Sequence, residues 1–152
     1  MSTDDIQFGV EKLKDILEES YNLYQEHHNE LVGEHIDFIP DVQKYLALEK
    51  SNKLHVFTIR DNGKLVGYSY FMTAPHHHRT QVIVAENTLF FITKDHRKGW
   101  LASNFIKYCE NLLFEWGISQ IQMRTKVRAS FGILLKRNKY TEEEVMYIKK
   151  RK

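Results

Sequence analysis

Apolar residues recur every three or four positions along the first part of the chain, with Glu and Lys between them. The residues at this spacing are Val10, Leu13, Ile16, Leu17, Tyr21 and Tyr24. Such a stripe predicts that the first segment is an amphipathic helix. A second, shorter helix is expected to begin at Ile39-Pro40-Asp41, because proline suits a first helical turn. Its apolar positions are Val42, Tyr45, Leu46 and Leu48.

The next part of the chain has the pattern of strands. Residues 54–60 and 65–73 are rich in β-forming side chains, and Asp61-Asn62-Gly63 between them is a strong hairpin signal. Residues 80–85 follow, and then a third strong strand at 87–93. That strand is apolar on both faces, so we expect it in the centre of the sheet.

The most regular helical stripe covers residues 97–116, and Gly117 is a plausible stop for it. A strand at 118–125, a short helix at 128–138 and a last strand at 143–149 are expected after it. A strand, a helix and a strand in immediate succession indicate a parallel pair inside a mixed sheet. The pattern therefore predicts a mixed α/β (α+β) fold with about six strands and about four helices.

Composition narrows the class of protein. With 152 residues, the chain is expected to form one domain over 1–152. Its 22 basic and 20 acidic residues leave a net charge of +2, too little by itself to imply binding to nucleic acid or membrane. The apolar runs are shorter than the roughly 18 residues of a membrane helix. The lone Cys109 fits a buried thiol in a cytoplasmic protein.

The turn after the central strand carries the chemistry, in the sequence Lys94-Asp95-His96-Arg97-Lys98-Gly99. The first backbone N–H groups of a helix lack intrahelical partners and lie at the positive end of its dipole, which suits a phosphate. Gly99 permits close backbone approach, and Arg97 and Lys98 add positive charge. The sequence therefore predicts an anion site here, without the patterns of a P-loop or a dinucleotide-binding turn.

This turn resembles the pyrophosphate loop of the GNAT superfamily of acyl-CoA-dependent N-acyltransferases, which reads [Q/R]-x-x-G-x-[G/A]. Arg97 fits the first position and Ala102 the last, while Trp100 stands where the family usually has glycine. The run at 103–110 and the passage Trp116-Gly117-Ile118 are also similar to the family. The R-K-G-W loop and the Pro-His-His-His segment look most like small members encoded by bacteriophages.

The resemblance implies a GNAT-like fold with a splayed central strand pair, and acetyl-CoA as the acyl donor without a metal. The backbone near Phe90, Phe91 and Ile92 would align the pantetheine arm and the thioester. An N–H near Phe90 would stabilise the oxyanion. The implied reaction is transfer of an acetyl group to a primary amine, on a small molecule or a protein, by direct attack in a ternary complex. The residues that would bind the cofactor phosphates are Arg97, Lys98, Gly99, Trp100, Leu101, Ala102 and Ser103.

Glu86 is the candidate catalytic base. It lies eleven residues before Arg97, an offset at which several GNAT members keep a catalytic glutamate. A strand carboxylate can take the proton of an attacking amine, although a solvated residue at the strand edge is the alternative. Many members have a tyrosine that donates a proton to the leaving thiolate, and Leu135 occupies that position in this chain. This gap leaves open a catalytically degenerate module that only binds acyl-CoA or a protein.

Several polar groups have weaker claims to a role. His76 and His78 are candidates for the wall of the acceptor site, with an exposed polar loop, or a metal site completed by a third ligand elsewhere, as the alternatives. His27, His28, Glu30, Glu34 and His35 cluster at the end of the first helix. His27 and Glu30, or His28 and His35, face one way, toward either a substrate or solvent. The acidic first helix, with Glu11, Asp15, Glu18, Glu19 and Glu26, attracts a cationic amine or is a solvated face.

Two further points concern partners. The basic tail 149–152 is interpreted as a frayed, solubilising end. A small nucleic-acid-binding protein is the rival class, and it would use Arg97, Lys98, Arg124, Lys126 and Arg128. A homodimer is compatible with the GNAT scaffold, but no residue argues for it.

Overall fold

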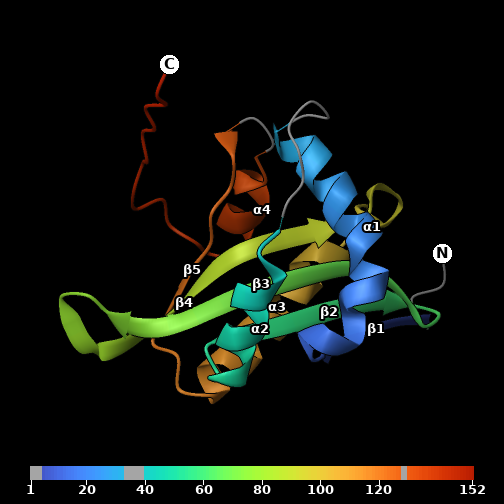
Figure 1. Ribbon diagram of the computed structural model, residues 1–152, viewed down its shortest axis with the longest axis horizontal. Helices are drawn as coiled ribbons and strands as arrows, with labels where there is room; N and C mark the ends of the chain where they lie inside the picture. The colour runs from blue at the N-terminus through green and yellow to red at the C-terminus, as the bar shows by residue number, and fades with distance from the viewer. Residues whose placement is uncertain (1–4, 33–39, 128–129) are drawn as a thin grey trace.

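The computed structural model describes residues 5–32, 40–127 and 130–152, and it has a five-stranded mixed sheet between two layers of helix (Figure 1). The strands are β1 (Ile6–Val10), β2 (Leu54–Asp61), β3 (Lys64–His76), β4 (Arg79–Ile92) and β5 (Gln120–Gln122), and they lie in this order in the sheet. Neighbours from β1 to β4 are antiparallel, and β5 is parallel to β4. The predicted mixed fold is confirmed.

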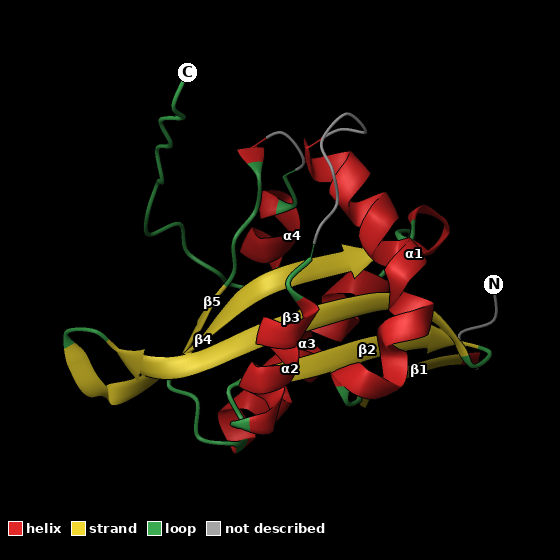
Figure 2. Ribbon diagram, in the orientation of Figure 1, coloured by secondary structure: helices red, strands yellow, loops and turns green. Residues whose placement is uncertain are grey.

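Helices α1 (Leu13–Val32) and α2 (Val42–Lys50) cover one face of the sheet, and α3 (Leu101–Glu115) covers the other (Figure 2). A 3₁₀ turn, η2 (Lys94–His96), follows β4, and α4 (Gly132–Arg137) follows β5. Within the part of the chain that the structure describes, no helix has the length and apolarity to cross a bilayer.

The face under α1 and α2 is closed by apolar and aromatic side chains. Leu13 and Ile16 of α1 are fully buried against Val56 of β2 and against the tyrosines of β3. The main-chain N–H of Leu13 donates to the Glu49 carboxylate at 2.7 Å, so the end of α2 satisfies the start of α1. Of the predicted stripe, Leu13, Ile16, Leu17 and Tyr24 lie in this core, whereas Val10 belongs to β1 and Tyr21 is 56% exposed.

The opposite face is closed by α3. Phe105, Cys109 and Leu113 are buried at helical spacing and pack on Phe57 and Ile59 of β2. Burial raises the pKa of the Cys109 thiol well above its usual value. The expectation of a buried, structural thiol is confirmed.

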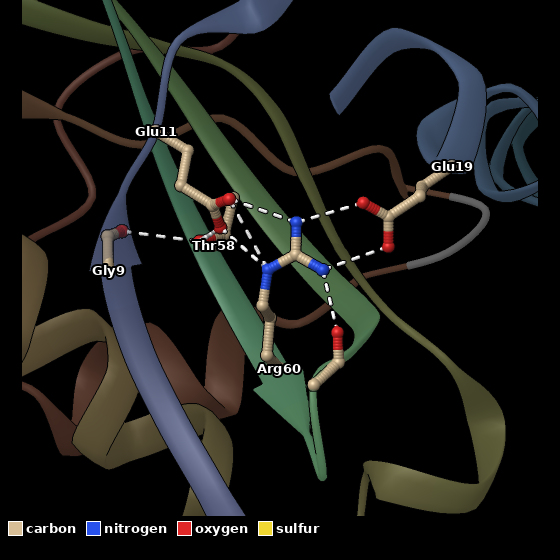
Figure 3. Close-up of polar contacts among 6 residues, drawn as sticks. Gly9, Glu11, Glu19, Thr58 and Arg60 are labelled. Atoms are coloured by element: carbon tan, nitrogen blue, oxygen red, sulfur yellow. Dashed lines mark hydrogen bonds and ion pairs between the residues drawn. The ribbon is translucent and has the colours of Figure 1, made fainter. Parts of the chain in front are cut away.

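Arg60 ties three elements together at one end of the sheet (Figure 3). Its guanidinium donates to the carboxylates of Glu11, which precedes α1, and of Glu19 in α1, at distances from 2.8 to 3.3 Å. It also donates to the Gly63 carbonyl of the β2–β3 hairpin at 2.8 Å, and the Thr58 hydroxyl donates to Glu11. Two of the acidic residues expected to attract an amine are therefore bound to Arg60.

The sequence pattern predicts helix at the start of the chain, and that prediction is wrong for residues 6–10. They form β1, which pairs with β2 from Ile6–Asp61 to Val10–Phe57. Five residues are too few to show a strand period against the long helical stripe that follows. Pairing with β2, far away in the sequence, decides their conformation.

The second half of the chain differs from the prediction in several boundaries. Residues 80–85 and 87–93 are one strand, β4, rather than two, and β5 covers only 120–122 of the predicted 118–125. Helix α3 begins at Leu101 rather than Arg97, and α4 begins at Gly132, with residues 128–129 outside the described part. The strand predicted at 143–149 is not formed: residues 141–152 belong to no helix or strand.

Candidate active site

Strands β4 and β5 separate at Glu86. They pair only at Val84–Gln120, Ala85–Ile121 and Glu86–Gln122, whereas β4 continues to Ile92. Beyond Glu86, β4 therefore has a strand partner only on its β3 side among the described residues. Figure 1 shows the chain that follows β5 running away from β4. The predicted splayed pair is present, and Glu86 stands where it opens.

A bulge in β4 lies directly beyond the opening. Tyr70 pairs with Leu89 and Phe71 with Asn87, so Thr88 is the extra residue. The buried Asn87 side chain donates to the Ser69 hydroxyl at 2.9 Å and to the Tyr70 carbonyl at 3.1 Å. This role of Asn87 is not among the predictions from the sequence, although an asparagine inside an apolar strand is a signal for it.

The three residues predicted to align the donor follow the bulge. The Phe90 ring stacks on Phe131 at 5.2 Å on the α3 side, and the Phe91 ring is buried on the α1 side. The Ile92 carbonyl accepts a hydrogen bond from Arg97 Nε at 2.7 Å. The side chains of Phe90 and Phe91 pack on the two faces of the sheet. The main chain of β4 therefore borders the opening between β4 and β5.

The turn from β4 into α3 leaves the helix start uncapped. Gly99 has φ +70°, a left-handed conformation that suits glycine, and a Cβ built there meets nothing within 4 Å. Trp100 is the N-cap residue, and its side chain makes no capping hydrogen bond. The first intrahelical bond runs from the Asn104 N–H to the Trp100 carbonyl at 2.8 Å. The N–H groups of the first turn are thus suited to an anion.

Arg97 is held by α1 rather than projecting freely from the loop. Its guanidinium lies 5.3 Å from the centre of the Phe91 ring and forms a two-pronged ion pair with Glu30 at 2.9 and 3.0 Å. Glu30 was predicted to face a substrate or solvent, and here it orients a loop residue. The sequence offers no signal for a pair separated by sixty-seven positions.

The rest of the loop contacts α4. The Ser103 side chain is buried and bonded to the Asn138 amide at 2.9 Å, so only its main-chain N–H is available to a ligand. Trp100 is 64% exposed, with the Arg137 guanidinium 5.5 Å from its ring centre. Leu101 and Ala102 pack partly on the α3-side core, and Lys98 is exposed. These contacts fix the direction in which α3 starts.

A second link holds the turn from the other side. His96 Nε2 lies 2.7 Å from the Asp61 carboxylate in the β2–β3 hairpin, and its Nδ1 lies 2.7 Å from the Thr93 hydroxyl. The Asp61 carboxylate accepts from the ring, and the link anchors η2 to the hairpin. His96 and Asp61 were not predicted as part of the site, because the contact depends on tertiary folding.

Glu86 itself is bound to Arg124. Its carboxylate lies 2.6 Å from Arg124 Nη1, in the chain that leaves β5, and both side chains are at least one-third exposed. In the sheet register Glu86 pairs with Met72, so its side chain is on the face covered by α1 and α2. The predicted base therefore lies at the opening of the strands, with a guanidinium beside it.

Hydroxyl and imidazole groups fill the core next to this face. His27 of α1 is only 8% exposed, lies 2.7 Å from the Tyr68 hydroxyl and stacks on Phe91 at 5.0 Å. The hydroxyls of Tyr24 and Tyr70 are hydrogen-bonded to each other. Burial lowers the pKa of His27 to about 4 and raises the pKa of Tyr68. The expectation that His27 faces solvent or a substrate is wrong; it is a core residue. Glu34 and His35 lie outside the described residues.

His76 and His78 lie on the hairpin between β3 and β4, which projects from the body of the molecule (Figure 1). The His78 N–H donates to His76 Nδ1 at 3.2 Å. At about 3.3 Å per residue, Arg79 is up to roughly 23 Å along β4 from Glu86. Their assignment to the acceptor site stays a prediction. No group of three potential metal ligands occurs within residues 5–32, 40–127 and 130–152.

The basic residues of the nucleic-acid hypothesis do not form one free surface. Arg97 is paired with Glu30 and Arg124 with Glu86, and Arg128 lies outside the described residues. Because paired guanidinium groups have a carboxylate beside them, they offer little net charge to a phosphate backbone.

Solved structures with this fold are numerous. An aminoglycoside acetyltransferase from an uncultured soil metagenomic sample superimposes with a TM-score of 0.76 at 12% identity, covering 99% of each chain. A ribosomal-protein-alanine N-acetyltransferase from Brucella melitensis biovar Abortus 2308 gives 0.71 at 16% identity, covering 97% of this chain and 99% of the other. A predicted acetyltransferase with acetyl-CoA from Clostridium acetobutylicum gives 0.68 at 15% identity, covering 95% and 96%.

At these identities the structures establish a common fold and leave the reaction open. No curated protein sequence matches the chain. The profile of the acetyltransferase (GNAT) family matches residues 10–130, which include the opening of β4 and β5, the uncapped turn and α3. This chain therefore belongs to the acetyltransferase (GNAT) family.

Proposed function

We propose that the protein is an N-acetyltransferase that moves the acetyl group of acetyl-CoA to a primary amine by direct attack in a ternary complex. One observation carries the proposal: the strands open at Glu86, and the opening leads along β4 to a helix start without a side-chain cap. The Glu86 carboxylate at one end of the opening suits an amine acceptor. The free N–H groups at the start of α3, at the other end, suit the phosphates of the donor. The acceptor class includes small molecules, by analogy with the aminoglycoside acetyltransferase that shares this fold.

The residues present fit the donor. The first-turn N–H groups of α3, with Lys98 beside them, would bind the diphosphate, and the left-handed Gly99 keeps the turn open. The main chain from Phe90 to Ile92 would hold the pantetheine arm and supply an N–H to the thioester oxygen. Bound acetyl-CoA supplies an acetyl group on a thiolate leaving group.

Glu86 would deprotonate the acceptor. As the amine nitrogen bonds to the carbonyl carbon, its proton passes to the Glu86 carboxylate, directly or through water. The carbon–sulfur bond then breaks, and the thiolate takes a proton from solvent, because Leu135 is buried and has no proton to give. The ion pair with Arg124 would hold the carboxylate at the opening of the strands. We also place the reaction in the cytoplasm, which suits the free Cys109.

A binding module without turnover is the second candidate. The buried Leu135 at the usual tyrosine position favours it, since the family's proton donor to the thiolate is missing. The two candidates share the donor site and differ only in whether an amine is acetylated.

The test is thiol release from acetyl-CoA over a panel of amines, including aminoglycosides, polyamines and peptides with free N-termini. Glu86→Gln should lower kcat by about 10²–10⁴-fold with acetyl-CoA affinity nearly unchanged. Glu18→Gln, at an exposed position of α1, is the matched control and should be neutral. Tight donor binding with no turnover of any amine would favour the module, and no donor binding would contradict both candidates.

A further inference from the structure

Trp100 presents its indole to solvent directly before α3. The side chain is 64% exposed, makes no capping hydrogen bond and belongs to neither hydrophobic core of the described residues. An indole covered on both faces would be far less exposed, so one ring face is open. An open aromatic face is a surface on which another planar ring can stack.

The Arg137 guanidinium lies beside this ring as a cation without a carboxylate. It is 5.5 Å from the centre of the Trp100 ring, within the range of a cation–π contact. Arg60, Arg97 and Arg124 are each bound to a glutamate. Arg137 has no such partner within the part of the chain that the structure describes. Its charge is therefore available to an anion.

Buried hydrogen bonds hold the ring and the guanidinium in place. Ser103, in the first turn of α3, is 3% exposed, and its hydroxyl accepts from the Asn138 amide at 2.9 Å. The same amide donates to the Leu134 carbonyl of α4 at 2.9 Å. The start of α3 is thereby joined to the end of α4, and this join fixes the backbone that carries Trp100 and Arg137.

We propose that Trp100 and Arg137 bind the adenosine 3′-phosphate end of coenzyme A, with the adenine stacked on the indole and the 3′-phosphate bonded to the guanidinium. The inference rests on the donor site proposed above. With the pantetheine arm along β4 and the diphosphate at the first turn of α3, the adenosine is attached on the far side of the diphosphate from β4. Trp100 is the N-cap residue of that turn, so its side chain is adjacent to the diphosphate site.

The two side chains suit the two groups that define this end of the donor. Purines stack on aromatic side chains, and a guanidinium binds a phosphate through two parallel N–H···O hydrogen bonds. An acyl group on the phosphopantetheine arm of a carrier protein has neither an adenine nor a 3′-phosphate. The pair would therefore make the enzyme select free acyl-CoA as its donor. The family's loop pattern usually has glycine in place of Trp100, so the stacking surface is a feature of this chain.

Tryptophan fluorescence tests the stacking. The chain has two tryptophans, and Trp116 lies past the other end of α3, roughly 24 Å away at 1.5 Å per residue. In the full-length Trp116→Phe variant, adenosine 3′,5′-bisphosphate should quench the emission of Trp100, because a stacked adenine quenches an indole. In Trp100→Phe, the same ligand should leave the emission of Trp116 unchanged.

Calorimetry tests the phosphate contact. The natural protein should bind CoA about tenfold more tightly than 3′-dephospho-CoA, and Arg137→Gln should bind the two ligands equally. Arg79→Gln, at an exposed position of the β3–β4 hairpin, is the matched control and should keep the preference. Trp100→Leu should weaken the binding of both ligands about tenfold. Because Trp100 and Arg137 are exposed, both variants should keep the melting temperature of the unliganded natural protein.

The outcomes separate this inference from the proposed function. Tight CoA binding without quenching of Trp100 would overturn the inference and leave the donor site standing. An Arg137→Gln variant that still prefers CoA to its dephosphorylated form would do the same. If the natural protein bound no CoA, the proposed function and this inference would both be contradicted.

Discussion

At the scale of single residues, His27 illustrates how a polar side chain comes to be buried. It follows the apolar stripe of α1, so helix formation turns it toward the sheet. The Tyr68 hydroxyl then satisfies one ring nitrogen, and Phe91 covers the ring face. Burial disfavours the charged form and lowers the pKa to about 4, with the Glu30 carboxylate opposing the shift.

This pKa makes stability depend on pH. Below about pH 6.5 the unfolded chain protonates this histidine, whereas the folded chain resists protonation until about pH 4. The contribution of neutral His27 to the free energy of unfolding is therefore fully present above pH 6.5. It is lost as the pH falls toward 4, and the loss over this range is about 3 kcal/mol. Urea unfolding of His27→Gln should show a flatter pH profile than the natural protein. Parallel profiles would contradict the assignment.

Gly99 is required for its backbone conformation rather than for space. With φ at +70° and nothing near a built Cβ, Gly99→Ala should strain the turn by about 1–2 kcal/mol. We expect weaker acetyl-CoA binding by calorimetry, because the strain displaces the N–H groups of the first turn of α3. Gly117→Ala, also at positive φ but after α3, should lose similar stability and keep the affinity. Equal affinity in both variants would count against the donor site.

At the scale of elements, the contacts between segments far apart in sequence position the loop. Glu30 of α1 holds Arg97, Asp61 of the hairpin holds His96, and Asn138 after α4 holds Ser103. Each contact is a hydrogen bond or an ion pair that fixes one side of the turn between β4 and α3. The turn is therefore built by three elements as well as by its own sequence.

The hydrogen bonds and ion pairs of Arg60 with Glu11 and Glu19, called the Arg60 clamp below, give a prediction at this scale. Arg60 lowers the pKa of Glu11 and of Glu19 through hydrogen bonds to their carboxylates. Arg60→Gln should cost about 1–3 kcal/mol at pH 7, less in high salt because the groups are partly exposed. The difference in free energy of unfolding between the natural protein and Arg60→Gln is present above the ordinary glutamate pKa. It disappears as the pH falls below that value.

The measurement is chemical denaturation of both proteins from pH 7 to pH 3. The two curves of unfolding free energy should converge at the acid end, where the carboxylates are protonated. Arg79→Gln, exposed on the β3–β4 hairpin, is the matched control and should leave the curve unchanged. A constant gap between Arg60→Gln and the natural protein would show that packing, rather than charge, is what the clamp contributes.

At the scale of the whole molecule, the sheet carries an independent core on each face. The α1 side holds tyrosines and His27, and the α3 side is apolar around Phe105. The proposed donor site lies at the end of the sheet where β4 passes into α3, so a bound donor would link β4, α3 and the loop between them. Binding there should stabilise the folded state as a whole.

Thermal unfolding measures that linkage. CoA at a concentration 100-fold above its Kd should add about 2.7 kcal/mol to the unfolding free energy. The melting temperature should then rise by several degrees, at roughly 2–4 °C per kcal/mol for a domain of this size. ATP at the same concentration is a control polyanion and should give a much smaller shift. Equal shifts with both ligands would indicate nonspecific anion binding.

Much of this molecule was open to prediction from the sequence. The stripes of α1 and α3, the Asn62-Gly63 hairpin and the turn proposed to bind an anion depend on local periodicity and on residues with special backbone freedom. Asn62 and Gly63 indeed adopt positive φ, at 49° and 82°. Such features arise from interactions within a few residues, which a sequence displays directly.

Tertiary structure decided the rest. Whether residues 6–10 pair, where β5 leaves β4, and which carboxylates hold Arg60, Arg97 and His96 depend on segments that meet only in the folded chain. The same holds for residues 143–149, whose strand pattern finds no partner strand within the described part of the chain. A strand needs a partner strand, and an ion pair needs a side chain of opposite charge. The sequence of one segment does not show where in space that partner will lie.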